Sequence, residues 1–291
     1  MSIDHLQDKI RKTKNPSMIT LELPANLLPP QIVEQTDSTA AAYAVFFDAL
    51  LDGLKGTVAA VRVPWGMFTL LGVKGMEALS RVLQKAKDCG FYVLLDGLDF
   101  GTPDAAEMVA DAVFGGENWS CDGIVVPVYL GSDSIKPFLQ YCQDKKKDVF
   151  VQAKTSNKSG PELQDLRTGS RQVHTAAMDL INRYGQPMVG KFGYSQVAAI
   201  VGAGAPDAIR TMRAKYQRVF FMTDGYDYPN GNAKNCSFAF DRLGHGAVAC
   251  AGSSVTAAWK NAESDGSDFV EQAVEAALRM KKNLTRYVTI L

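Results

Sequence analysis

The sequence predicts an α/β fold in which eight parallel strands close into a (β/α)8 TIM barrel. Short runs rich in Val, Ile and Leu alternate with longer amphipathic segments along all 291 residues. The short runs are apolar throughout, as strands buried on both faces are. The turn after the first run, Glu22-Leu23-Pro24-Ala25, has no glycine-rich dinucleotide motif, which argues against an open doubly wound sheet. The eight expected strands are residues 18–23, 58–63, 92–95, 123–128, 149–155, 197–202, 218–223 and 247–251.

Helices are expected between these strands because most of the gaps carry a start or stop signal. Ser38 is an N-cap before an apolar helical face, and Gly90 ends an amphipathic segment. Pro103 and Pro206 each stand at the first position of a helix. The clearest expected helices are residues 73–89, 103–114, 171–184 and 268–282. We expect one domain over residues 1–291, with an N-terminal helical extension (1–17) and a closing helix (264–291).

Composition argues against several classes of protein. Lys+Arg and Asp+Glu both number 31, so there is no basic field to attract nucleic acid. The five cysteines are odd in number and contain no CxxC, which is typical of reduced thiols in the cytoplasm and not of a zinc site. No apolar run reaches the ~20 residues of a membrane helix, and the charged N-terminus has no secretory segment. We therefore expect a cytoplasmic protein with no cofactor and no nucleic-acid or membrane partner.

Carboxylates gather at the predicted carboxyl ends of the strands, where a TIM barrel places its chemistry. Asp96 ends the third strand and is the first candidate for a catalytic residue. Carboxylates with open geometry also suit a divalent metal such as Mg²⁺. The simpler interpretation is that they point outward as turn residues. The carboxylates that would form such a metal site are Glu22, Asp96, Asp99, Asp224 and Asp227.

The polar segment after the fifth strand has both structural and functional interpretations. Lys154 would be a Schiff-base nucleophile if it were buried with a lowered pKa, but a Lys at a strand exit more often pairs with a carboxylate. Ser156 and Asn157 would bind the edge of a ring or close the loop through their own turns. The loop 156–170 is long for this fold, which favours a functional role. His174 is expected at the surface of the following helix.

Short motifs at successive strand exits resemble those of the orotidine 5′-phosphate decarboxylase family, in its long bacterial branch. Together they cover nearly the whole chain in the family's order. The motifs are Asn15-Pro16-Ser17, Tyr129-Leu130-Gly131-Ser132-Asp133, Lys154-Thr155-Ser156-Asn157, Leu163-Gln164-Asp165-Leu166, Gly225-Tyr226 and Gly252-Ser253-Ser254.

The resemblance implies a homodimeric barrel that binds a pyrimidine nucleotide monophosphate. By analogy with the family, Ser156 would bind the pyrimidine ring, and the turns after strands seven and eight would hold the phosphate through backbone N–H groups. The implied ligand-binding residues are Lys154, Thr155, Ser156, Asn157, Gly225, Tyr226, Gly252, Ser253 and Ser254.

The sequence departs from the family pattern where the chemistry is expected. The family motif Asp-x-Lys-x-x-Asp falls on Asp96, Leu98 and Gly101, so its Lys and second Asp are missing. The phosphate-binding Arg falls on Val255, and the Lys at the end of strand two is Arg62. Further departures are Leu23 for the Asp at the end of strand one, and Pro229-Asn230-Gly231 for the Gln-Gly-Gly phosphate loop.

We therefore expect a homologue of orotidine 5′-phosphate decarboxylase, a lyase of pyrimidine biosynthesis, in which these departures argue against efficient decarboxylation. Activity would require a Lys or Arg that has moved in, and Arg62 and Lys154 are the candidates. One alternative is a non-catalytic, nucleotide-binding paralogue. The other is an enzyme of altered, possibly metal-assisted chemistry on a phosphosugar or nucleoside.

Overall fold

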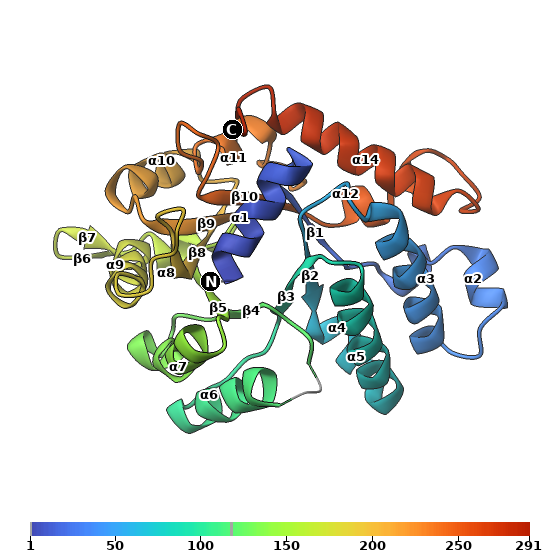
Figure 1. Ribbon diagram of the computed structural model, residues 1–291, viewed down its shortest axis with the longest axis horizontal. Coiled ribbons are helices and arrows are strands. Elements are labelled where there is room, and N and C mark those ends of the chain that lie inside the picture. Colours follow the sequence, from blue (N-terminus) through green and yellow to red (C-terminus); the bar gives the residue numbers. More distant parts are fainter. Residues whose placement is uncertain (1, 117–118) are drawn as a thin grey trace.

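A closed barrel of parallel strands forms the centre of the molecule (Figure 1). The computed structural model describes residues 2–116 and 119–291. Within these residues the strand order around the barrel is β1-β10-β9-β8-β5-β4-β3-β2, and every barrel pair is parallel. The predicted TIM barrel is therefore confirmed. The barrel strands are β1 (Ser17–Thr20), β2 (Ala60–Pro64), β3 (Tyr92–Asp96), β4 (Gly123–Val126), β5 (Asp148–Lys154), β8 (Ser195–Gly202), β9 (Val219–Asp224) and β10 (Ala247–Ala251).

Helices follow the strands and form the outer layer, as Figure 1 shows. The Ser38 cap is present, because its hydroxyl accepts a hydrogen bond from the Ala41 amide. Thr102 caps the helix predicted to begin at Pro103, because its hydroxyl accepts a hydrogen bond from the Ala105 amide. The longer helices are α1 (Ser2–Thr13), α3 (Thr39–Leu54), α5 (Gly72–Asp88), α6 (Pro103–Ala110), α7 (Lys136–Asp144), α9 (Val173–Gly185), α10 (Pro206–Lys215) and α14 (Phe269–Leu284). The short ones are α2 (Pro30–Glu34), α4 (Trp65–Thr69), α8 (Pro161–Gln164), α11 (Ala233–Ser237), α12 (Ser253–Thr256) and α13 (Ala258–Asn261).

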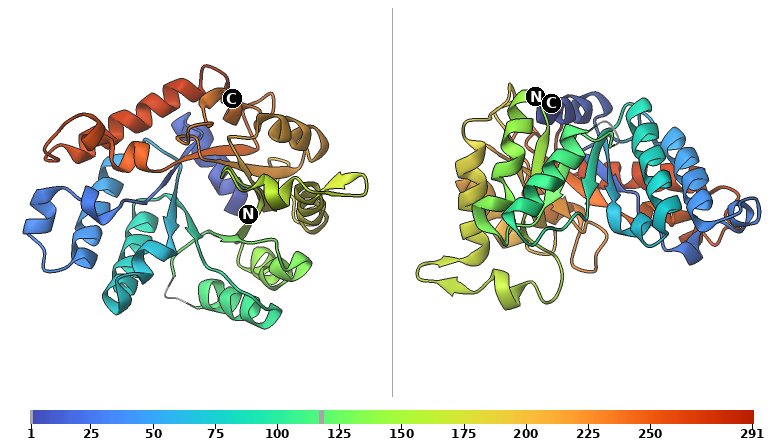
Figure 2. Two further views of the ribbon diagram at one scale, coloured as in Figure 1. Left: turned by 180° about the vertical axis from the view of Figure 1, so that it is seen from behind. Right: turned by 90° about the horizontal axis from the view of Figure 1, so that it is seen from below.

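The long loop after β5 has more structure than the sequence suggested. It contains α8 and a two-stranded hairpin, β6 (Arg167–Thr168) and β7 (Arg171–Gln172), which projects from the body of the molecule in Figure 2. Strands of two polar residues have no apolar alternation, so no sequence pattern marks them. The hairpin also delays the start of α9 to Val173, two residues later than predicted.

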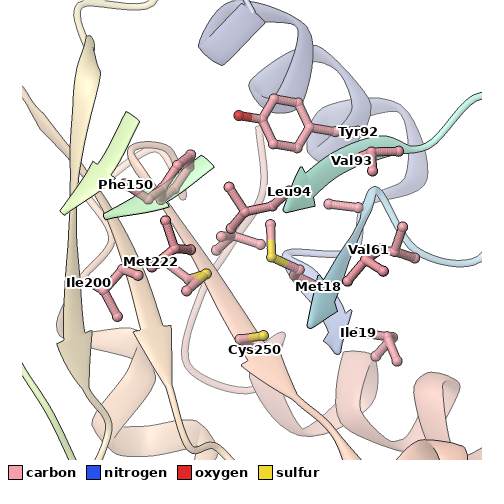
Figure 3. Packing of buried hydrophobic residues seen from close by; sticks show 14 of the residues in the cluster. Met18, Ile19, Val61, Tyr92, Val93, Leu94, Phe150, Ile200, Met222 and Cys250 are labelled. Carbon is pink, nitrogen blue, oxygen red and sulfur yellow. The ribbon is translucent and has the colours of Figure 1, made fainter. Parts of the chain in front are cut away.

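The strands are buried on both faces, which explains their unbroken apolar runs. All eight residues of β8 are buried, as are all four of β1. Phe150 packs edge-on between the rings of Tyr92 and Phe220, at centroid distances of 6.4 and 6.3 Å. Figure 3 shows Tyr92, Phe150 and Met222 among the side chains that fill the barrel. Large side chains therefore fill the barrel and leave its chemistry to the ends of the strands.

Helix α1 covers the amino-terminal end of the barrel. Its apolar face, formed by Ile3, Leu6 and Ile10, is almost completely buried. Gln7 accepts a hydrogen bond from the Gly246 amide, directly before β10. Figure 1 shows α1 lying across the centre of the barrel. The opposite end, where the strands terminate, is thereby the end available for a site. None of the helices in the described residues is long and apolar enough to cross a membrane.

The burial of α1 predicts a large stability cost for truncating its central side chain. Leu6 is 0% exposed, so Leu6→Ala should lower the free energy of unfolding by about 2–5 kcal/mol through lost burial and a residual cavity. Urea unfolding followed by circular dichroism measures this loss. Leu278→Ala in α14 is the matched control, because Leu278 is 47% exposed. Equal losses in the two variants would contradict the assigned role of α1.

Candidate active site

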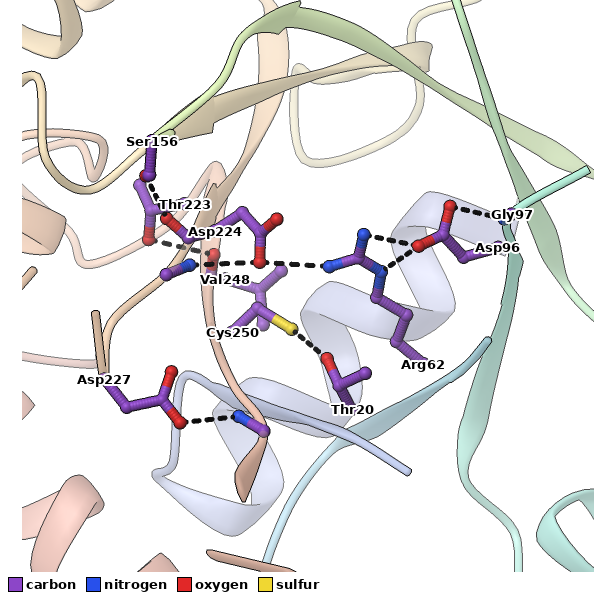
Figure 4. A network of polar contacts seen from close by, with 12 residues as sticks. Thr20, Arg62, Asp96, Gly97, Ser156, Thr223, Asp224, Asp227, Val248 and Cys250 are labelled. Carbon is purple, nitrogen blue, oxygen red and sulfur yellow. Dashed lines mark hydrogen bonds and ion pairs between the residues drawn. The ribbon is translucent and has the colours of Figure 1, made fainter. Parts of the chain in front are cut away.

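The guanidinium of Arg62 is the centre of the polar network at the carboxyl end of the barrel (Figure 4). Arg62 lies near the end of β2, and its side chain is 11% exposed. Its Nε is 2.7 Å from Asp96 Oδ2, and its Nη2 also contacts this oxygen. Its Nη1 is 3.0 Å from Asp224 Oδ1. Arg62 thus links the ends of β2, β3 and β9.

Both carboxylates that hold Arg62 are themselves held by a following glycine. The amide of Gly97 donates to Asp96 Oδ1 at 2.6 Å, and the amide of Gly225 donates to Asp224 Oδ1 at 3.0 Å. The two glycines have φ values of +91° and +79°, a conformation that side chains disfavour. The repeated Asp-Gly pair therefore turns each strand end so that its carboxylate reaches Arg62.

The two carboxylates keep Arg62 ionised. Burial lowers the pKa of the Arg62 guanidinium, but the opposite charges of Asp96 and Asp224 outweigh this effect, and the pKa is raised overall. A cation with a raised pKa holds its protons more tightly than a free arginine does. Arg62 can therefore stabilise negative charge, but it is a poor proton donor.

A neutral thiol lies beside this ion cluster. Cys250 in β10 is fully buried, and its Sγ is 3.1 Å from the hydroxyl of Thr20. Burial raises the pKa of the Cys250 thiol to about 12, although the charge of Arg62 opposes the rise. Because a thiol with such a pKa is almost entirely protonated at neutral pH, it is not an activated nucleophile.

Two more acidic side chains flank the turn after β10. Asp227 Oδ2 accepts hydrogen bonds from the amides of Gly252 at 2.9 Å and Ser254 at 3.2 Å. A Cβ atom at Gly252 would lie 2.1 Å from Glu22 Oε1, so the Glu22 side chain packs directly against this glycine. Burial raises the pKa of the Glu22 carboxyl, and the charge of Arg62 opposes the rise. The turn is thus enclosed by two carboxyl groups.

The Thr155-Ser156-Asn157 segment is bonded within the protein. Ser156 donates to the backbone carbonyl of Asp224 at 3.0 Å. The backbone amide of Thr155 donates to the side-chain carbonyl of Gln164 in α8 at 2.9 Å, and the side-chain amide of Gln164 donates to the Thr155 hydroxyl at 2.7 Å. The Thr155 hydroxyl also contacts the side chain of Asn157. These bonds fold the loop against β5 and place Ser156 beside the Asp224 turn.

Lys154 belongs to a separate cluster. Its Nζ is 2.6 Å from Asp165 Oδ1, and the same oxygen is 3.1 Å from His174 Nδ1. The bond to the Lys154 ammonium lowers the pKa of the Asp165 carboxyl. The side chains of Lys154 and His174 are both 8% exposed. The expectation that His174 lies at the surface is wrong. The folded loop after β5 covers the start of α9, and the backbone carbonyl of Gln164 contacts the His174 imidazole.

The five carboxylates proposed as a metal site do not form one. Asp99 is exposed and accepts a hydrogen bond from the Phe100 amide. Arg62 occupies the space between Asp96 and Asp224. In residues 2–116 and 119–291, no three His, Cys, Asp or Glu side chains are arranged to hold a metal ion. The alternative that these residues point outward is also wrong for Asp224 and Asp227, which face the site (Figure 4).

Comparison with known proteins identifies the family. The model of the "Orotidine 5′-phosphate decarboxylase / HUMPS family" matches residues 47–264. The chain belongs to this family. It is 29% identical to an orotidine 5′-phosphate decarboxylase from Rhodopirellula baltica over 90% of each chain. It is 27% identical to one from Clostridium novyi over 98% of each chain.

Solved structures of the family share the fold. Orotidine monophosphate decarboxylase from Leishmania donovani superimposes with a TM-score of 0.70 at 23% identity, covering 97% of this chain and 100% of that one. The Methanocaldococcus jannaschii enzyme in complex with the inhibitor BMP superimposes with a TM-score of 0.60 at 15% identity, covering 92% and 97%. At these identities the likeness concerns the fold alone.

The positions where the family motif is interrupted carry no polar side chain. Leu98 is partly buried and packs against the hydrophobic core. Gly101 is exposed, and a Cβ atom there would have no neighbour within 4 Å. Val255 is 1% exposed in α12. No ionised group therefore stands at the motif lysine, at the second motif aspartate or at the phosphate arginine.

A mainly apolar cavity of about 490 Å³ opens beside Glu22. The hydroxyl of Tyr43 donates to the carbonyl of Leu23 at 2.6 Å and thus fixes one wall. This cavity adjoins the turn after β10 through Ser253 and is large enough for a small molecule. Its lining includes Glu22, Leu23, Tyr43, Met67, Leu71 and Ser253.

The Arg62 cluster predicts a loss of stability when the arginine is removed. Arg62→Met leaves the partly buried carboxylates of Asp96 and Asp224 without their cation, which should cost about 3 kcal/mol, the lower end of the range for breaking a buried ion pair. Chemical denaturation measures this loss.

Arg81→Met is the matched control for this experiment. Arg81 pairs with Asp48, but its side chain is 61% exposed, so the substitution should cost less than about 1 kcal/mol. A similar loss in both variants would show that the Arg62 cluster does not stabilise the strand ends.

Proposed function

We propose that this protein binds a pyrimidine ligand at the carboxyl end of its barrel and does not decarboxylate orotidine 5′-phosphate. The main observation behind this proposal is that Leu98 stands at the position of the motif lysine, while Arg62 is paired with both Asp96 and Asp224. The protein would thus be a non-catalytic relative of proteins named orotidine 5′-phosphate decarboxylase.

The chemistry of the reaction supports this proposal. Direct decarboxylation leaves a carbanion on the ring, which needs a nearby cation and then a proton. A positioned acid typically contributes 10²–10⁴-fold, or about 3–5 kcal/mol. Leu98 cannot supply a proton, and Arg62 releases one less readily than a free arginine because its pKa is raised. Lys154 is bound to Asp165 in its own cluster, so it does not take over this role.

Binding of a small molecule is supported by the place and the lining of the site. Active sites of TIM barrels lie at the carboxyl ends of the strands, where Arg62, Asp96 and Asp224 converge. The adjoining cavity near Glu22 combines apolar walls with a few polar groups, as ligand sites do. The BMP complex of the Methanocaldococcus jannaschii relative suggests a nucleotide-like class of ligand.

A turnover assay and a calorimetric titration on one sample test this proposal. We expect no release of CO₂ from orotidine 5′-phosphate under conditions in which the Clostridium novyi relative is active. We expect heat of binding from uridine, or from uridine 5′-monophosphate or its 6-hydroxy analogue, and none from Mg²⁺. Turnover would overturn the proposal and would mean that Arg62 or another cation performs the work of the missing lysine.

We also propose that the protein is a homodimer, as the family resemblance implies. Large apolar side chains are exposed in segments that follow β2 and β4: Leu70 is 86% exposed, Val73 77% and Tyr129 84%. Surfaces of this kind often mark protein–protein contacts. Light scattering should give twice the chain mass of 31.6 kDa, and Leu70→Asp should shift the protein towards the monomer. Leu278→Asp is the control, and a wild-type monomer would refute the dimer.

The cytoplasm is the compartment that we propose. The cysteines of the described residues are all free, and most are buried. Burial raises the pKa of the Cys121 and Cys236 thiols to about 12 each, which keeps them in the unreactive protonated form. Free thiols of this kind are typical of a reducing environment.

A further inference from the structure

We propose that Asp227 takes the place of a ligand phosphate in this protein, so that the site accepts an unphosphorylated pyrimidine nucleoside and rejects the nucleotide. This inference rests on the proposed function and specifies its ligand. It is carried by the contacts of one carboxylate with the turn after the last barrel strand, together with the charges that surround that turn.

The position of Asp227 coincides with the usual phosphate position of a TIM barrel. Such barrels often bind phosphate between the loops after strands seven and eight, beside a short extra helix. In this chain the seventh and eighth barrel strands are β9 and β10, and the short helix α12 follows β10 directly. Asp227 lies in the loop after β9 and reaches the turn between β10 and α12.

Asp227 already uses the backbone donors of this turn. The amides of Gly252 and Ser254 both donate to its Oδ2, at 2.9 and 3.2 Å. A phosphate oxygen that used the same two donors would have to occupy the position of this carboxylate oxygen. The protein thus supplies an anionic acceptor of its own where a nucleotide would present its phosphate.

The loop that carries Asp227 is closely packed. The amide of Tyr228 donates to the carbonyl of Gly225 at 3.2 Å, and the amide of Gly231 donates to the carbonyl of Tyr228 at 2.8 Å. A Cβ atom at Gly231 would lie 1.8 Å from the Gly225 carbonyl oxygen, so the two ends of the loop are in direct contact. This closure holds Asp227 over the turn after β10.

The surrounding charges also disfavour a phosphate. The carboxyl group of Glu22 also lies against Gly252. The positive charge of Arg62 is compensated by Asp96 and Asp224. Val255, the next residue after Ser254, is apolar and buried. A phosphate dianion would therefore meet like charge with no free cation from these residues.

A nucleoside offers the group that Asp227 can still bind. In residues 2–116 and 119–291, Asp227 accepts its hydrogen bonds through Oδ2, and Oδ1 remains available as an acceptor. The 5′-hydroxyl of a nucleoside is a donor, whereas a phosphate at the same place is an acceptor that carries negative charge. One carboxylate thus favours the hydroxyl and excludes the phosphate, which is specificity by repulsion as well as by attraction.

The test compares uridine, uridine 5′-monophosphate and inorganic phosphate by calorimetry on the full chain. The wild type should bind uridine at least about tenfold more tightly than the nucleotide, since like-charge contacts cost at least this factor. Asp227→Ala should shift the ratio of nucleotide to uridine affinity by about tenfold or more towards the nucleotide. The same variant should bind inorganic phosphate where the wild type does not.

Two further variants make the outcome decisive. Asp207→Ala removes the same charge from a side chain that is 94% exposed, and it should leave the ratio unchanged. Asp227→Asn keeps the shape of the side chain and removes its charge, so it should weaken the exclusion of phosphate. This variant replaces Asp227→Ala in the test if Asp227→Ala does not fold.

The inference is overturned if the wild type binds the nucleotide as tightly as uridine, or fails to bind uridine. It is also overturned if a folded Asp227 variant leaves the ratio unchanged. Turnover of orotidine 5′-phosphate by the wild type would instead overturn the proposed function, so the two failures are distinguishable.

Discussion

The ion cluster of Arg62, Asp96 and Asp224 is the constraint on which the carboxyl end of this barrel depends. A buried guanidinium is tolerated only when its charge is compensated and its donors are used. Here the compensation comes from two strands, β3 and β9, while Arg62 itself comes from β2. Removing Arg62 would leave both carboxylates without their cation, so the ends of β3 and β9 depend on one side chain from β2.

The same pairing decides what the site can do chemically. A cation stabilises a carbanion best when its own charge is not already compensated. The charge of Arg62 is compensated by two carboxylates. The family motif has a lysine and a second aspartate on the segment after the third strand, and this chain has Leu98 and Gly101 there. The proposed lack of decarboxylation rests on both observations: Leu98 and Gly101 carry no charge, and the charge of Arg62 is paired within the protein.

Much of the fold follows from the sequence, whereas the directions of side chains at the site do not. Apolar runs predicted the eight barrel strands because strands buried on both faces require such runs. The inward orientation of Asp224 depends on the positive φ of Gly225 and on the position of β2 across the barrel, and the sequence shows neither. The burial of His174 depends on a loop that folds back through Gln164, so helical position alone gave the wrong answer.

The proposed exclusion of phosphate would account for two features of this end of the barrel. Buried backbone N–H groups that lose their acceptor cost about 1–3 kcal/mol each, so a turn without a bound phosphate needs another acceptor. Asp227 is such an acceptor for Gly252 and Ser254. Where a carboxylate of the protein fills this place, an arginine for the phosphate would have no ligand, and the buried apolar side chain of Val255 fits instead. Under this proposal, the acidic Asp227 and the apolar Val255 are two consequences of excluding the same group.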